Sequence, residues 1–155
     1  MQFHIHAMGE TLDTWTQEGI SNYEKRFSSP FTLKTHAYPI PKRQQNQNIL
    51  AYQAKEYLLL TSSLKKSDLI ICLDEHGKHF TSKSFANHIG NWQNQYSRIC
   101  FLLGGPDGHH TSTIHRAQIR LSLSPFTMPH GLARLVLIEQ LYRAMTLIKK
   151  HPYHR

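Results

Sequence analysis

Cysteine is scarce in this chain of 155 residues: Cys72 and Cys100 are its only two, and each stands inside a short apolar run. Thiols in such surroundings are predicted to be buried and reduced rather than joined in a disulfide. A four-cysteine zinc site and a disulfide-held miniprotein are therefore excluded.

Long apolar runs are missing as well. No stretch approaches the roughly 20 apolar residues that a membrane-spanning helix needs. The first seven residues, Met-Gln-Phe-His-Ile-His-Ala, lack the basic and apolar regions of a signal peptide. We therefore expect a cytoplasmic protein without a membrane partner. Apolar residues make up 39% of the chain, enough for a core, and its length fits a single domain over residues 1–155.

Acidic residues are few: 10 Asp and Glu stand against 18 Lys and Arg, a formal net charge of +8. From Gly108 to Arg155, seven basic residues are accompanied by one acid, Glu139, and six of the 12 histidines lie there too. Such a concentration of positive charge favours a nucleic acid partner over solubility alone.

Strand and helix signals alternate along the whole chain. Alternating apolar residues predict half-buried strands over 3–9 and 31–37, whereas continuous apolar runs predict fully buried strands over 69–73 and 99–103, with a further strand over 119–123. Helical spacing predicts helices over 12–27, 49–64, 82–92, 113–118 and 132–148. Thr11 or Thr14 is expected to cap the first helix, Ser82 the third, and Gly77 to turn the chain. This order predicts an α/β fold, a mostly parallel sheet flanked by helices.

Ligands of parallel sheets bind beyond the carboxyl ends of the strands. Three such ends carry distinctive residues, and we expect them to open on the same side: Leu73-Asp74, Leu103-Gly104-Gly105 and the segment 123–128. The run Gly104-Gly105-Pro106-Asp107-Gly108 lets a ligand approach the backbone, although an ordinary tight turn would use the same residues. It matches neither the dinucleotide fingerprint nor a P-loop.

The segment from Ser122 to His130 is apolar and contains two prolines. Such a loop is expected to be buried against a flat apolar ligand or a partner subunit, with plain core packing as the alternative. His130 stands just before a helix, as a cap or as a ligand contact. Glu139 and Arg143 have the spacing of an exposed helical ion pair.

The histidine spacings do not predict a metal site. His4 and His6 alternate on a strand, His109 and His110 are adjacent, and no cysteine or acid stands near His151 and His154. The basic tail from Lys149 to Arg155 is either a frayed end or an RNA contact, because it combines an aromatic ring, an imidazole and cations.

Several motifs, taken in their order along the chain, strongly resemble those of one family. They are Met8-Gly9, 102–108, 121–124, 127–130, Arg134, 139–144 and the terminal His-Pro-Tyr-His-Arg. This is the ribosomal large subunit methyltransferase H family, which methylates N3 of a pseudouridine in 23S ribosomal RNA with S-adenosylmethionine. The resemblance covers the whole chain. It implies the α/β-knot of the SPOUT superfamily, a deep trefoil knot, in a homodimer that acts on the assembled ribosome.

The resemblance also implies a cofactor site made largely of backbone groups. Its residues are Leu73, Gly104, Leu123, Ser124, Pro125, Phe126, Thr127 and Met128. Pro125-Phe126 departs from the family pattern and is expected to reshape the pocket wall. His109-His110 is also unusual, and we expect it to affect only the outer rim.

Methylation of N3 requires an unpaired base and loss of the N3 proton. By hypothesis, His154 assists proton loss, Arg143 or Arg155 stabilises the anion, and Tyr153 stacks on the base, with His130 as the reserve base. Proton loss to bulk water is the alternative. Two other functions stay open: a SPOUT methyltransferase for another RNA nucleotide, and a noncatalytic RNA- or ribosome-binding module.

Overall fold

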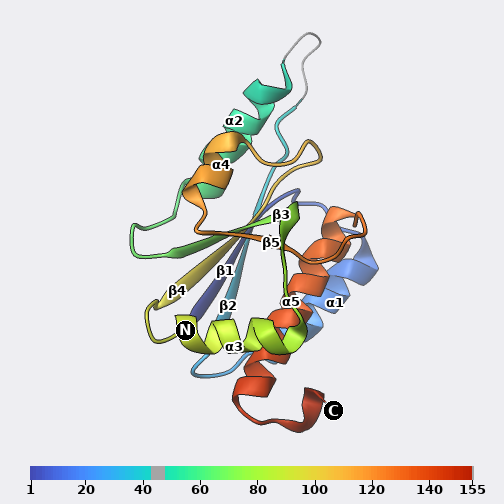
Figure 1. Ribbon diagram of the computed structural model, residues 1–155. Helices are drawn as coiled ribbons and strands as arrows, with labels where there is room; N and C mark the ends of the chain where they lie inside the picture. The colour runs from blue at the N-terminus through green and yellow to red at the C-terminus, as the bar shows by residue number, and fades with distance from the viewer. Residues whose placement is uncertain (43–47, 155) are drawn as a thin grey trace.

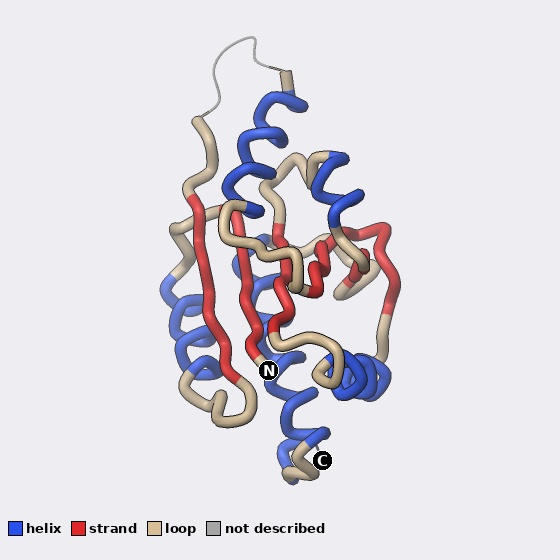
Figure 2. The backbone as a smooth tube through the Cα atoms, turned by 90° about the vertical axis from the view of Figure 1, so that its left-hand side faces the viewer, coloured by secondary structure: helices blue, strands red, loops and turns tan. Residues whose placement is uncertain are grey.

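The fold is built on one five-stranded parallel sheet. The computed structural model describes residues 1–42 and 48–154, with only the backbone of His154. Its strands are β1 (Gln2–Met8), β2 (Thr32–Tyr38), β3 (Leu69–His79), β4 (Arg98–Leu103) and β5 (Ile119–Ser122). They lie in the order β2-β1-β4-β3-β5, and every pair is parallel (Figure 2). The predicted parallel α/β sheet is confirmed.

Helices cover both faces of this sheet. They are α1 (Thr14–Glu24), α2 (Ile49–Thr61), α3 (Ser82–Trp92), α4 (Thr111–Arg116) and α5 (His130–Ile148), followed by the 3-10 turn η1 (Pro152–His154). α5 packs against both α1 and α3, whereas α2 and α4 lie at the end of the molecule remote from the C-terminus (Figure 1). In the described part of the chain, no helix combines the length and apolar character that crossing a membrane requires.

The main core lies between the sheet and the layer of α1, α3 and α5. Phe3 and Ile5 of β1, Phe101 of β4 and Leu137 of α5 are fully buried there. A smaller apolar cluster of Ile70, Cys72 and Leu102 occupies the opposite face. β3 and β4 are therefore buried on both faces over their apolar runs, as predicted. Cys72 and Cys100 are buried and unbridged, also as predicted.

β1 corrects one prediction, because it is not half-buried. His4 and His6 point away from the main core, yet only 7% and 1% of their surface is exposed. They are tolerated there because they pair with the neighbouring strand: His4 Nδ1 lies 3.1 Å from His36 Nε2, and His6 Nδ1 lies 3.0 Å from the Tyr38 hydroxyl. Burial above all, and then nearby positive and imidazole groups, lowers the pKa of each to about 4.

Gly77 corrects a second prediction, because it does not turn the chain. It lies inside β3, where the pairing with β5 shifts in register between Leu73 and Lys78. A Cβ at this position would lie 2.6 Å from the Leu121 carbonyl carbon and 2.7 Å from the Ser122 nitrogen. The glycine is there because β5 passes too close for any side chain.

Helix starts differ from prediction by one or two residues. Asp13, rather than Thr11 or Thr14, occupies the N-cap of α1. The N-cap of α3 is Thr81 rather than Ser82, and the Thr81 hydroxyl accepts the Ser84 N–H at 3.1 Å. The Asp13 side chain makes no capping hydrogen bond, so of these two helix starts only that of α3 is stabilised by its N-cap side chain.

The buried histidines should make stability depend on pH. Unfolded histidine protonates near 6.5 but His4 and His6 only near 4, so the free energy of unfolding should fall as the pH drops from about 6.5 to about 4. Each contributes a slope approaching about 1.4 kcal/mol per pH unit. Urea unfolding in metal-free buffer at several pH values measures it. His6→Gln should flatten the slope and the exposed His79→Gln should not; equal slopes in both would contradict this account.

Candidate functional site

A pocket of about 540 Å³ opens at the carboxyl ends of β4 and β5 and beside the middle of β3. Its walls come from the three segments singled out in the sequence: residues 73–76 of β3, the glycine turn after β4 and the loop after β5. These segments open on one side, as predicted, because parallel strands run the same way along one sheet. The predicted end of the third strand at Leu73 is wrong, since β3 continues to His79 after its apolar run stops.

The pocket brings together nearly all of the residues predicted for the cofactor. Those lining it are Leu73, Gly104, Leu123, Ser124, Phe126, Thr127 and Met128. Pro125 belongs to the same loop but is not among the lining residues. The Phe126 side chain is 83% exposed at the rim, and its N–H donates to Ser124 Oγ at 2.9 Å. The structure thus assembles the predicted set without testing what it binds.

A buried acid that the sequence analysis did not identify stabilises the glycine turn. Glu56 of α2 is buried, and its carboxylate accepts the Gly105 N–H at 3.1 Å. A Cβ at Gly105 would lie 2.2 Å from Glu56 Oε1, and Gly108 has a φ of +77°, so both positions require glycine. Glu56 shares the buried side of α2 with Tyr52 and Leu60, and that placement was the available signal.

His109 lies inside the pocket rather than at its outer rim, which corrects the prediction. Its Nε2 is 2.9 Å from the Leu73 carbonyl oxygen, and a Cβ at Gly104 would lie 3.1 Å from its Nδ1. Burial lowers the pKa of His109, although the bond to Leu73 opposes this. Within the described residues, its buried Nδ1 has no hydrogen-bond partner. This nitrogen is buried beside Gly104 and away from solvent.

The polar wall of the pocket is centred on Asp74 at the end of the apolar run of β3. Its carboxylate accepts the His76 N–H at 2.8 Å and pairs with Arg120 at 3.1 Å. Burial opposes ionisation, but these partners together hold the pKa of Asp74 below its usual value. An ionised carboxylate there is an acceptor suited to ligand hydroxyl or amino groups.

His130 lines the pocket as the first residue of α5, and Pro129 takes the capping position. Burial, and secondarily the charge of Arg134, lowers the pKa of His130. Arg134 is itself buried one turn further on, where it donates to the carbonyl oxygens of Met8 at 3.2 Å and Gly9 at 2.8 Å. The start of α5 is thereby attached to the end of β1, and His130 is held neutral beside the pocket.

The C-terminal tail is docked through Tyr153 and is not frayed up to that residue. The Tyr153 hydroxyl lies 3.0 Å from that of Tyr23 and donates to Glu139 Oε1 at 3.3 Å. Arg143 donates to the same oxygen at 3.0 and 2.6 Å, and its guanidinium lies 5.2 Å from the centre of the Tyr153 ring. Glu139 and Arg143 are therefore part of a half-buried cluster rather than the isolated exposed pair that their spacing suggested.

The predicted catalytic residues fall into two separate groups. His130 is at the pocket, whereas Arg143 and Tyr153 lie at the other end of α5, near the C-terminus (Figure 1). Thirteen residues of helix separate His130 from Arg143, a rise of about 20 Å. His154 continues η1 by its backbone, and Arg155 lies outside the described residues. A single chain therefore does not bring its tail cluster to its own pocket.

Comparison with known proteins identifies the family. The family model described as "Predicted SPOUT methyltransferase" matches residues 1–154. The chain belongs to the SPOUT methyltransferase family. Proteins named "Ribosomal RNA large subunit methyltransferase H" are 34% identical to it over 155 residues. Those of Hydrogenovibrio crunogenus and Neisseria meningitidis serogroup C align over 100% of this chain and 99% of their own length, and that of Francisella philomiragia over 100% of both.

The basic tail of this SPOUT methyltransferase is only partly available to an outside partner. Lys149 Nζ donates to the carbonyl oxygens of Ser28 at 3.0 Å and Ser29 at 2.8 Å, so it ties the end of α5 to the turn before β2. Lys150 is exposed. Of these two lysines, Lys150 is the better candidate for a phosphate contact.

Proposed function

We propose that this protein transfers a methyl group from S-adenosylmethionine to N3 of a pseudouridine in 23S ribosomal RNA of the assembled ribosome. The observation that supports this proposal most directly is the pocket beside β3 and at the carboxyl ends of β4 and β5, in a chain of the SPOUT methyltransferase family. The name shared by full-length relatives supports a large-subunit ribosomal RNA substrate. The net charge of +8 supports a polyanionic partner.

The pocket suits a cofactor of this size. Its volume of about 540 Å³ falls in the range of roughly 300–1,000 Å³ typical of small-molecule sites. Gly104 leaves its wall without a Cβ, and the Asp74 carboxylate on the same wall offers a hydrogen-bond acceptor. The residues proposed to hold the cofactor are Leu73, Gly104, Leu123, Ser124, Pro125, Phe126, Thr127 and Met128. When bound, S-adenosylmethionine supplies the electrophilic methyl group.

Residues of the chain itself have to bind the base and remove its N3 proton. N3 lies on the pairing edge, so the base must leave its pairing partner before it reacts. Burial above all, then the hydrogen bond that the two hydroxyls of Tyr153 and Tyr23 share and the nearby Glu139 carboxylate, raises the pKa of Tyr153, which therefore stays a protonated phenol and serves to stack or donate. We assign proton removal to His154, with His130 in reserve, and stabilisation of the anion to Arg143 or Arg155.

The separation of the proposed catalytic residues into two groups is the reason why the proposal includes a homodimer. Because about 20 Å of helix separates the tail cluster from the pocket in one chain, the tail would serve the pocket of a second copy. Phe126 at the pocket rim and Trp15 are 83% and 56% exposed, and exposed aromatic rings of this kind suit a contact between protomers. The proposal also includes the trefoil knot that the family resemblance implies.

The reaction itself can be tested with S-adenosylmethionine labelled with tritium in its methyl group. Label should enter the 23S RNA of assembled ribosomes, and should be lower with free large subunits, naked ribosomal RNA or tRNA. Nuclease digestion and chromatography should then place it on one pseudouridine. Label in tRNA alone would show a different RNA substrate, and no label anywhere would favour a noncatalytic RNA-binding module.

Cofactor binding should depend on Gly104. Gly104→Val should weaken S-adenosylmethionine binding about tenfold or more, because the new side chain would crowd His109 and overpacking costs roughly 1–3 kcal/mol. Titration calorimetry measures the affinity. Gly90→Val is the matched control, since a Cβ at Gly90 has no atom within 4 Å. Parental affinity in folded Gly104→Val protein would move the cofactor site elsewhere.

A mixing experiment tests whether tails are exchanged between protomers. At an S-adenosylmethionine concentration near the dissociation constant of the parent protein, Gly104→Val protein and a chain truncated after Pro152 should each have little activity alone. In a mixed dimer, one of the two sites combines an intact pocket with an intact tail, so random mixing should restore about a quarter of the parental activity. Methyl transfer to ribosomes measures it. If each tail serves its own pocket, mixing restores nothing.

A further inference from the structure

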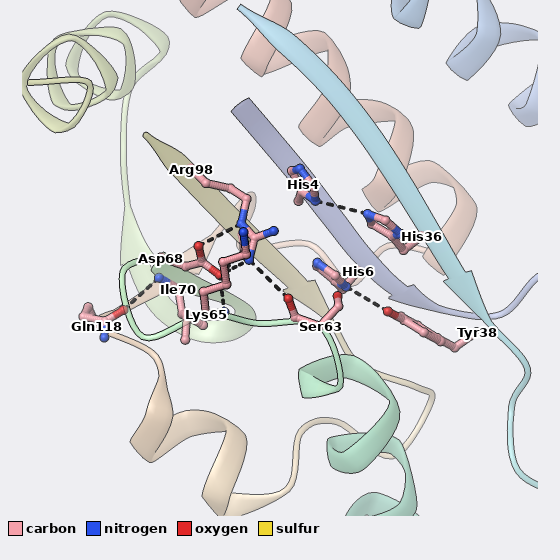
Figure 3. A network of polar contacts seen from close by, with 11 residues as sticks. His4, His6, His36, Tyr38, Ser63, Lys65, Asp68, Ile70, Arg98 and Gln118 are labelled. Carbon is pink, nitrogen blue, oxygen red and sulfur yellow. Dashed lines mark hydrogen bonds and ion pairs between the residues drawn. The ribbon is translucent and has the colours of Figure 1, made fainter. Parts of the chain in front are cut away.

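Three histidines gather on the face of β1 and β2 that points away from the main core. His4 and His6 alternate along β1, and the parallel register places His36 of β2 directly opposite His6 (Figure 3). Because β2 is the edge strand of the sheet, the cluster lies near the side of the molecule. None of the three lines the pocket, so the cluster is independent of the proposed methyl transfer.

The ring nitrogens lie close enough to share one ion. One nitrogen of each ring can be chosen so that all three lie within 4.8 Å of one another, and no other three potential ligands in residues 1–42 and 48–153 meet this condition. His4 Nδ1 and His36 Nε2 are 3.1 Å apart. Two nitrogens bound tetrahedrally to zinc, each about 2.0–2.1 Å from it, are separated by about 3.3–3.4 Å. This pair therefore already has nearly the spacing that coordination needs.

The cluster also contains nitrogens without partners. His4 Nε2 and His6 Nε2 are buried and make no hydrogen bond to any described residue. His6 Nδ1 is held by the Tyr38 hydroxyl at 3.0 Å, which orients the ring and leaves Nε2 as the donor for a ligand. Metal-bound histidines commonly have such a partner on their second nitrogen. A buried nitrogen left unpaired costs free energy, which a bound ion would recover at His6 Nε2.

We propose that His4, His6 and His36 bind a divalent first-row transition ion, with zinc as the expected occupant. Three imidazoles without a carboxylate or thiolate match the ligand preference of zinc, copper and nickel rather than that of calcium or magnesium. Three protein ligands leave a fourth position for water, next to the half-buried His36. The ion would tie edge strand β2 to β1.

The surrounding charges are compatible with a cation. Arg98 points toward the cluster from β4, but its charge is matched by Asp68, whose Oδ1 accepts the Arg98 Nε–H at 2.8 Å (Figure 3). Lys34 lies opposite His4 in the register, two residues before His36, but it is exposed and can turn into solvent. Binding requires a ring rotation, since the His6 and His36 planes are now only 11° from parallel. Rotation about the last side-chain bond of histidine meets only broad, shallow preferences.

Metal content provides the test. Chain purified without a polyhistidine tag, stripped with a chelator and dialysed against zinc should retain one ion per chain by elemental mass spectrometry. With cobalt as the probe, the same site should give the intense visible bands of a tetrahedral complex. His36→Gln should abolish both signals, with an affinity loss beyond the roughly 10–100-fold that follows loss of an outer partner. His79→Gln, which alters an exposed histidine outside the cluster, should retain both.

A second variant tests the proposal if circular dichroism shows that His36→Gln does not fold. Tyr38→Phe removes only the hydroxyl that orients His6, so it should keep one ion per chain and bind it about tenfold more weakly. Parent protein that retains no ion would overturn the proposal, since the histidines would then be a metal-free stacked cluster. Equal zinc uptake by parent, His36→Gln and Tyr38→Phe would overturn it too, by assigning the ion to other histidines.

Discussion

The close approach of β5 to Gly77 is the contact on which the ligand side of the molecule depends. With any side chain at that position, a Cβ would lie 2.6 Å from the Leu121 carbonyl carbon, and β5 would have to move away. β5 leads directly into the segment 123–128, which forms one wall of the pocket. Moving β5 would separate that wall from Leu73 and from the glycine turn after β4. The absence of a Cβ at Gly77 thus allows the three segments that line the pocket to lie close together.

A second constraint is the length of α5. The helix begins beside the pocket, where Arg134 attaches it to the end of β1, and ends beside the cluster of Tyr23, Glu139, Arg143 and Tyr153. A packed helix is a rigid rod, so the distance between its two ends does not change when a ligand arrives. In the proposed mechanism, the tail of one molecule therefore serves the pocket of another.

The side chains on the two faces of β1 are stabilised by different interactions. Phe3 and Ile5 contribute apolar burial to the main core, whereas His4 and His6 are buried beside polar partners from β2. The same device appears at the glycine turn, where buried Glu56 accepts a backbone N–H. A buried polar group is stable only where a partner from another segment reaches it. Polar residues of this kind are therefore found where distant segments meet, and both sites discussed above are such places.

The alternation of strands and helices, the buried runs of β3 and β4, the three segments that line the pocket and the family could all be predicted from the order of residues along the chain. Hydrophobic period and glycine placement carry that information, because they depend on neighbours along the chain. Four features became visible only in the folded chain: His36 lies beside His6, Glu56 supports Gly105, Gly77 continues a strand, and His109 lines the pocket. Each of these depends on the register and order of segments far apart in sequence, which packing selects and local periodicity does not encode.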